Sequence, residues 1–97
     1  MTVTVLVKLT VKPSRYSDAC AVLTSAGPSM RAESGCIAYD FYSVDADPST
    51  IYVLETWTDM DAFDAHGTQP HLVAMRDKLM PMMDAPPEFI PLTKFGA

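Results

Sequence analysis

Cysteines, clusters of basic residues and long hydrophobic runs are what this sequence lacks. Its only cysteines are Cys20 and Cys36, which are too few for the disulfide scaffold of a small secreted domain and match no metal-ligand spacing. We expect both thiols to be reduced and half-buried. Thr and Lys residues interrupt the Val-rich N-terminal segment. Neither a signal peptide nor a membrane span is therefore predicted, and a cytoplasmic location is expected.

Positive charge is also scarce. Seven Lys and Arg residues stand against twelve Asp and Glu residues, and the net charge is −5. Because the basic residues are scattered, nucleic acid and anionic membranes are disfavoured as partners. The motifs of nucleotide-binding loops, zinc proteases and serine hydrolases are missing. The sequence therefore implies no cofactor.

A metal-binding motif is missing as well. His66 and His71 are separated by a Gly-Thr-Gln-Pro break, so they do not share one helix face as zinc-binding histidine pairs do. No cysteine lies near them in the sequence. No metal site is predicted.

What is present is an ordinary globular composition in a short chain. Hydrophobic residues make up 48% and charged residues 20% of the 97 residues. We predict a single domain over residues 1–97, because chains divide into separate cores only at greater length. A core of this size is thin, so oligomerisation would help to stabilise it.

Four segments have the residue patterns of β-strands: residues 3–11, 36–44, 51–58 and 89–92. The first alternates apolar and polar residues, and the next two are rich in aromatic and β-favouring side chains. Residues 45–50 are almost all turn-formers, which predicts a β-hairpin. Pro91 cannot donate a hydrogen bond inside a sheet, so the last strand should lie at an edge or carry a bulge.

The first predicted helix follows the first strand. Ser14 is its expected N-cap, and its apolar spacing extends to about Glu33. Gly27-Pro28 should kink or restart this helix, because proline removes a donor and clashes with the preceding turn. Gly35 stands where a left-handed residue would end it.

Two shorter helical stretches follow the hairpin. The Thr-x-x-Asp sequence at residues 58–61 predicts a helix that begins near Asp59 and ends at Gly67. Its apolar face would carry Ala62, Phe63 and His66. A second stretch follows Pro70 and extends to about Met83. Its apolar stripe would contain Leu72, Met75, Leu79 and Met82 or Met83.

The order of these elements, β-α-β-β-α-β, predicts an α+β fold of the ferredoxin-like type. In that fold a four-stranded antiparallel sheet carries both helices on one face and leaves the other face bare. The hairpin is apolar or aromatic on both faces, with Ile37, Tyr39 and Phe41 on one and Ala38, Tyr42 and Val44 on the other. A homodimer that packs sheet against sheet is therefore predicted. A monomer with exposed aromatic residues is the alternative.

His66 and Trp57 are the most informative chemical candidates. A lone tryptophan at a strand end usually packs in the core. His66 shares a helix face with Phe63 and should point toward the sheet, which puts an imidazole in an apolar wedge. Without a partner there, its charged form is disfavoured and a neutral base remains near physiological pH. A structural histidine would explain the same pattern.

Carboxylates and phenols near these residues are further candidates. Glu55 shares a strand face with Trp57, and Asp40 follows Tyr39 directly. A solvated face explains either carboxylate, but either could also orient a nearby imidazole. Tyr39 would supply a phenol donor if it lined a cavity, although packing in a dimer interface is the commoner outcome. The methionines, Met75 among them, suit an adaptable apolar pocket.

Three runs of sequence carry a resemblance to a known family: Glu33-Ser-Gly-Cys-Ile-Ala-Tyr-Asp-Phe-Tyr42, Ile51-Tyr-Val-Leu-Glu-Thr-Trp-Thr-Asp59, and Ala62-Phe-Asp-Ala-His66 with Gln69-Pro-His71. Together they resemble the antibiotic-biosynthesis monooxygenase family of small dimeric α/β-barrel proteins. The resemblance implies a ferredoxin-like protomer, a homodimer formed by sheet packing, and a pocket in each protomer between the sheet and the helices.

Several members of that family oxygenate phenols, quinols or anthrone-like compounds with O₂ and without metal or flavin. The resemblance therefore implies a cofactor-independent monooxygenase of small aromatic hydroxy compounds. In that role His66 is the candidate base, while Trp57 and Tyr39 form the pocket wall and can donate hydrogen bonds. His71 is a second donor at the pocket mouth. The remaining substrate-binding candidates are Glu55, Phe63 and Met75.

Three other functions are open. A non-catalytic dimer could hold apolar metabolites in the same pocket. A related branch of the family degrades haem with a helix histidine, a strand asparagine and a tryptophan, but this sequence has no asparagine. Another branch resembles isomerases of small phosphorylated ketones. Such a substrate needs a basic phosphate site, and this chain offers only the scattered Lys8, Arg76 and Lys78.

Overall fold

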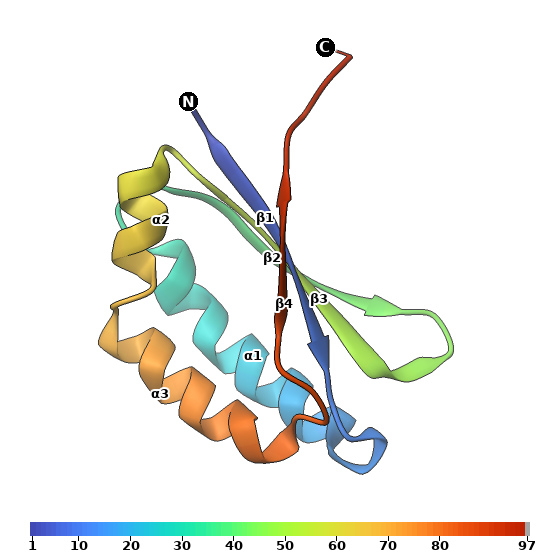
Figure 1. Ribbon diagram of the computed structural model, residues 1–97. Coiled ribbons are helices and arrows are strands. Elements are labelled where there is room, and N and C mark those ends of the chain that lie inside the picture. Colours follow the sequence, from blue (N-terminus) through green and yellow to red (C-terminus); the bar gives the residue numbers. More distant parts are fainter. Residues whose placement is uncertain (97) are drawn as a thin grey trace.

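The chain folds into a four-stranded antiparallel sheet with its helices on one face (Figure 1). The computed structural model describes residues 1–96. The strands are β1 (Val3–Thr10), β2 (Cys36–Val44), β3 (Asp47–Trp57) and β4 (Glu88–Leu92). Their order across the sheet is β2-β3-β1-β4. The element order and this topology confirm the predicted ferredoxin-like α+β fold.

Three helices cover one face of the sheet (Figure 1). They are α1 (Tyr16–Arg31), α2 (Met60–His66) and α3 (Pro70–Leu79), with 3₁₀ turns η1 (Pro13–Arg15) and η2 (Met80–Met82). The Asp59 carboxylate accepts a hydrogen bond from the Ala62 backbone N–H at 2.8 Å. This contact caps α2 and explains why the helix begins where the sequence predicts. Among residues 1–96, no helix is both long enough and apolar enough to cross a membrane.

The hydrophobic core lies between the helices and the sheet. Val5, Val7 and Leu9 of β1 point toward the helices and are buried, as the alternation predicts. On the neighbouring strand the same face runs from buried apolar residues to Glu55 and Trp57, which are also buried. One end of the covered face therefore combines a polar group with a large aromatic ring.

The first helix differs from its prediction at both ends. Ser14 lies in η1 and is not the N-cap, since α1 begins only at Tyr16. The helix continues through Pro28 without a restart. Pro28 is exposed and lies in the last turn, so it removes one hydrogen bond near the helix end and displaces no packed side chain. Gly35 has the predicted left-handed conformation, with a φ of +85°, but it does not end the helix, because α1 ends at Arg31 with Ala32 as its C-cap.

The hairpin is tighter and less regular than predicted. Strand β3 begins at Asp47, so only Asp45 and Ala46 lie between the strands. The Asp47 carboxylate accepts hydrogen bonds from the Ser49 backbone and hydroxyl, which stabilises an irregular strand start in place of a long turn. A bulge between Cys36 and Ala38 takes Ile37 out of the alternation. Ile37 is therefore exposed and does not share the covered face with Tyr39.

The opposite face of the sheet carries no helix of the described chain (Figure 1). Leu6 at its centre pairs with Leu54 on β3 and with Ile90 on β4. Tyr42 pairs with Tyr52 on the same face. The side chains of Tyr42 and Ile90 are 52% and 40% exposed. Strand β4 pairs with β1, lies at the end of the strand order and contains Pro91, which confirms the predicted edge position.

Candidate active site

A cavity of about 390 Å³ lies between the sheet and helices α2 and α3. Its wall is mostly apolar, and its polar residues are concentrated where β2, β3 and α2 meet. Five predicted site residues line it: Tyr39, Glu55, Phe63, His66 and Met75. The exposed Asp64 and Arg76 also contribute to the wall.

His66 is the last residue of α2 and is buried. Its ring lies against the Trp57 indole, with 4.6 Å between the ring centroids, and its centroid is 5.5 Å from that of Tyr39. Gly35 permits this placement, because a Cβ on Gly35 would stand only 2.6 Å from the Ala62 Cβ of α2. The first turn of α2 thus packs directly on the end of the α1–β2 turn.

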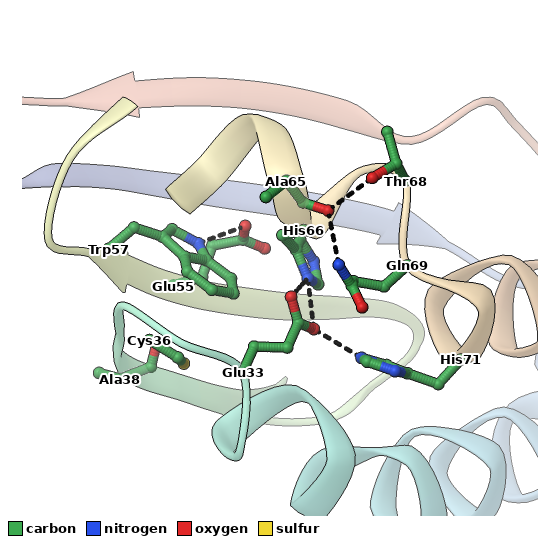
Figure 2. Close-up of polar contacts among 10 residues, drawn as sticks. All are labelled: Glu33, Cys36, Ala38, Glu55, Trp57, Ala65, His66, Thr68, Gln69 and His71. Carbon is green, nitrogen blue, oxygen red and sulfur yellow. Dashed lines mark hydrogen bonds and ion pairs between the residues drawn. The ribbon is translucent and has the colours of Figure 1, made fainter. Parts of the chain in front are cut away.

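Glu33 is the partner of His66 that the sequence does not predict. It lies in the turn between α1 and β2, and its carboxylate is 2.8 Å from His66 Nδ1 and 2.6 Å from His71 Nε2 (Figure 2). Only 9% of the Glu33 side chain is exposed. The condition of an imidazole without a partner does not hold, because a carboxylate holds one ring nitrogen, and that carboxylate is Glu33 and neither Glu55 nor Asp40.

Two imidazoles and a carboxylate can also form a zinc site, but the contacts here are hydrogen bonds. Tetrahedral ligands at about 2.0 Å from zinc lie roughly 3.3 Å from one another. The nitrogen of His71 and the Glu33 oxygen are closer than that, at 2.6 Å. Within residues 1–96, no group of three or more His, Cys, Asp or Glu side chains is arranged to hold a metal ion.

Glu55 and Trp57 form a second buried polar contact. The Trp57 indole N–H donates to a Glu55 carboxylate oxygen at 3.0 Å (Figure 2). Burial raises the pKa of Glu55, while this hydrogen bond and the nearby His66 act in the opposite direction. Trp57 does not line the cavity but packs behind His66. Its N–H is thus already occupied by Glu55 and is not directed at a ligand.

On the buried residues of the cavity wall, three side-chain polar atoms have no protein partner among residues 1–96: His66 Nε2, the second carboxylate oxygen of Glu55, and the Tyr39 hydroxyl. Every fully buried side-chain nitrogen or oxygen in this described part of the chain does have a hydrogen-bond partner. Each of these three atoms therefore keeps some exposed surface, and the residues that carry them line the cavity. Burial, reinforced by the charge of Glu55, raises the pKa of Tyr39, so its hydroxyl stays protonated and can donate.

His71 and Asp40 lie away from the cavity. His71 borders a separate groove of about 350 Å³ between α1 and α3, and 32% of its side chain is exposed. It is therefore not at the cavity mouth but reaches His66 through Glu33. Asp40 is exposed and pairs with Leu54 on the face without helices. It cannot orient His66 from there.

A topological signal for Glu33 exists in the sequence, although it is weak. Cys36 pairs with Trp57, so the first residue of β2 and the last residue of β3 lie side by side at the same end of the two strands. The turn that precedes Cys36 must then lie near the helix that follows Trp57. This reasoning places Glu33 near α2, but only the backbone geometry of the turn directs its carboxylate toward His66.

Comparison with known families places the chain in a defined class. The profile of the Antibiotic biosynthesis monooxygenase family matches residues 2–78. The protein belongs to this family. The sequence resemblance to it is thereby confirmed.

Individual proteins resemble this chain in sequence or in structure. An uncharacterized protein of Synechocystis sp. is 27% identical over 78 residues, which cover 80% of this chain. The chain spans about half of that relative's length, 53%. Rv0793 of Mycobacterium tuberculosis has a similar structure, with a TM-score of 0.89, 26% identity, and coverage of 100% of this chain and 98% of its own.

Two further solved structures have the same fold. A conserved protein from Methanosarcina mazei has a TM-score of 0.90 and 25% identity, with 98% of this chain and 94% of that chain covered. PA3566 from Pseudomonas aeruginosa has a TM-score of 0.89 and 21% identity, with 98% and 95% covered. The architecture is thus shared at low sequence identity, and the chemistry must be argued from the side chains.

Proposed function

We propose that this protein is a cofactor-independent monooxygenase that oxidises small aromatic hydroxy compounds with O₂. The observation that carries the proposal is His66, a buried imidazole that lines an apolar cavity and whose Nε2 atom has no protein partner within residues 1–96. A small, flat, hydroxylated ring system suits a cavity of about 390 Å³. Membership of the family supports a monooxygenase-like protein. The class of substrate is inferred from the residues that line the cavity.

The proposed reaction begins with proton transfer from the ring hydroxyl to His66 Nε2. The resulting anion transfers one electron to O₂, giving a ring-centred radical and superoxide. These two recombine to form a C–O bond, and the peroxide takes up the proton held by His66. Loss of the ring C–H proton and of hydroxide from the peroxide, which together make one water molecule, then gives the quinone. One O₂ oxidises one substrate molecule, with one oxygen atom in the quinone and one in water.

Two other cavity residues have proposed roles in this reaction. Tyr39 donates a hydrogen bond to the anion, because its raised pKa keeps the hydroxyl protonated. The open oxygen of Glu55 contacts a second polar group of the substrate, since its other oxygen is held by Trp57. Phe63 and Met75 supply apolar wall around the ring. Water exclusion by this wall strengthens the polar contacts within it.

Oxygen uptake tests the function directly. The purified protein is incubated with a panel of hydroquinones and anthrones, and uptake is compared with the uncatalysed rate. We expect H66A to lower the catalysed rate by about 100-fold or more, the usual contribution of a general base. The control M60A alters an exposed residue of the same helix and should leave the rate unchanged. A rate that H66A does not change would reject the proposal. Tight binding without turnover would instead support a small-molecule-binding protein.

We also propose that the protein is a homodimer packed through the sheet face without helices. Tyr42, Ile90 and Leu92 are exposed on that face or at its edge. Burial of such side chains against a second copy would remove apolar surface from water. Sedimentation at micromolar concentration should give twice the 10.6 kDa chain mass, and a mass near 10.6 kDa would reject the dimer. Single-domain organisation over residues 1–97 and a cytoplasmic location stay predictions.

A further inference from the structure

Glu33 connects the ends of two helices to the start of a third. It lies two residues after the end of α1, while His66 ends α2 and His71 is in the first turn of α3. One carboxylate therefore contacts two imidazoles that are separated by the loop between α2 and α3 (Figure 2). We call Glu33, His66 and His71 the His-Glu-His cluster. Its two imidazoles differ in burial, with 6% of the His66 side chain exposed and 32% of that of His71.

An ionised carboxylate only accepts hydrogen bonds, so the nitrogen that faces it must carry a proton. Both Glu33 oxygens lie within hydrogen-bond distance of His66 Nδ1, at 2.8 and 3.1 Å. Neutral His66 is then the Nδ1–H tautomer, and its lone pair is on Nε2. Nε2 has no protein partner in the part of the chain that the structure describes, residues 1–96, and His66 lines the cavity. Glu33 thus leaves the proton-accepting nitrogen free to face the cavity.

His71 acts on this arrangement from outside the cavity. A buried carboxylate has lost most of its hydration and needs hydrogen-bond donors in exchange. His71 supplies one such donor from Nε2 at 2.6 Å, to the same oxygen that is closest to His66. Without that donor, one contact that fixes the Glu33 carboxylate beside His66 is lost. His71 does not line the cavity, so its influence on substrate passes through Glu33.

We propose that Glu33 and His71 are positioning residues that hold His66 as the Nδ1–H tautomer with Nε2 toward the cavity. The catalytic consequence rests on the proposed function, whereas the tautomer does not. When His66 takes up a proton at Nε2, the negative charge of Glu33 stabilises the imidazolium. The Glu33 carboxylate, held by His71, therefore has two roles. It orients the His66 ring, and it stabilises the charged form of His66.

Nitrogen-15 NMR tests the tautomer without any substrate. The chain has only two histidines, so the imidazole spectrum of the full-length protein contains two spin systems. H71Q and H71L each leave His66 as the single histidine and assign it. At a pH where the imidazoles are neutral, we expect His66 to carry its proton on Nδ1 in the wild type. A proton on Nε2 in the wild type would overturn the proposal, whatever the variants do.

Matched variants separate the hydrogen bond from the charge. E33Q keeps an acceptor oxygen, whereas E33M keeps a similar length without one. We expect His66 to keep its tautomer in E33Q and to become a mixture of tautomers in E33M. H71Q keeps a donor near the Nε2 position and should resemble the wild type, while H71L should resemble E33M in part. An E33M spectrum in which His66 is unchanged would reject the proposal.

Kinetics then measure what the positioning contributes. With a substrate found in the oxygen-uptake panel, we expect E33M to lower kcat by on the order of 100-fold and H71L by about 10-fold, with KM little changed. H71Q should recover most of the loss. Equal losses in H71Q and H71L would show that His71 does not act as a donor to Glu33 and would reject its positioning role.

Two further outcomes are separable from these. If the wild type shows the expected tautomer but no oxygen uptake, the proposed function fails and the positioning of His66 stands. A zinc titration provides the last control. If one equivalent of Zn²⁺ shifts both imidazoles together, the cluster is a metal site and the positioning proposal is overturned.

Discussion

The two faces of the sheet differ in how deeply they bury their polar and aromatic side chains. On the face covered by helices, Glu55 and Trp57 are buried and hydrogen-bonded to each other. On the other face, Tyr42 is 52% exposed. Burial is what changes chemistry, because only a group removed from water has its protonation strongly altered by its neighbours. The covered face therefore carries the candidate active site, and the other face is suited to association.

The largest expected effect comes from removing the indole on the covered face. W57A would leave a cavity behind His66 and an unpaired Glu55 carboxylate, and we expect a loss of about 3–5 kcal/mol of unfolding free energy. Urea unfolding followed by circular dichroism measures it, since the variant has no tryptophan to report by fluorescence. F95A removes a ring that is exposed near the C-terminus and should change stability by less than about 0.5 kcal/mol. Similar losses in both variants would contradict the assignment of Trp57 to the core.

The next effect concerns the turn that places α2. G35A adds a Cβ 2.6 Å from the Ala62 Cβ at a φ of +85°, and we expect a loss of about 1–3 kcal/mol together with a shifted His66 resonance. Gly96 provides the matched control, because its φ is +80° but no atom lies within 4 Å of a Cβ there. If G35A and G96A cost the same, the backbone angle alone explains the cost and the contact with α2 does not.

The fold was accessible from the sequence because each element carries a local pattern. Alternation in residues 3–11 specifies β1, and the Thr-x-x-Asp sequence at residues 58–61 places the start of α2 to within a residue or two, although the cap is Asp59. The departures arise where tertiary context decides. Two examples are Pro28, which lies in an exposed last turn of α1, and the bulge that takes Ile37 out of its expected face. Both depend on packing between segments that are distant in the sequence.

The candidate site was predictable only in part. The stripe of α2 and the strand face of Glu55 placed His66 and Glu55 on the covered face, because a helix face and a strand face follow from periodicity. Glu33 lies in a turn, where no period relates a residue to its direction. His71 follows a helix break, so its direction could not be inferred from His66. The contact between these residues is a property of three chain segments together.

Glu55 gives a pH-dependent effect of intermediate size. Its pKa is raised in the folded protein by burial, so the folded state holds this proton more tightly than the unfolded state. The resulting stabilisation is fully present below the ordinary Glu pKa and is lost as pH rises through the raised pKa. E55Q should remove this decline in the unfolding free energy, measured by urea unfolding across that pH range. An identical pH dependence in E55Q and wild type would show that Glu55 is not the group responsible.

The smallest effect on protomer stability is expected on the face without helices. Y42D should change the unfolding free energy of the monomer by less than about 0.5 kcal/mol, because the side chain is half exposed. The same substitution should dissociate the proposed dimer in sedimentation, since it would bury a charge in the interface. V73D alters an exposed position on α3 and serves as the control. A dimer that survives Y42D would move the interface elsewhere.

The central claim is that His66 presents a proton-accepting Nε2 atom to a substrate in the cavity. A crystal structure of the protein with a bound hydroquinone, prepared without oxygen so that no reaction occurs, tests it most directly. The account predicts the ring between the sheet and α3, with one hydroxyl oxygen about 2.6–3.2 Å from His66 Nε2. A ring bound elsewhere, or His66 turned away from the cavity with Nε2 in solvent, would contradict it.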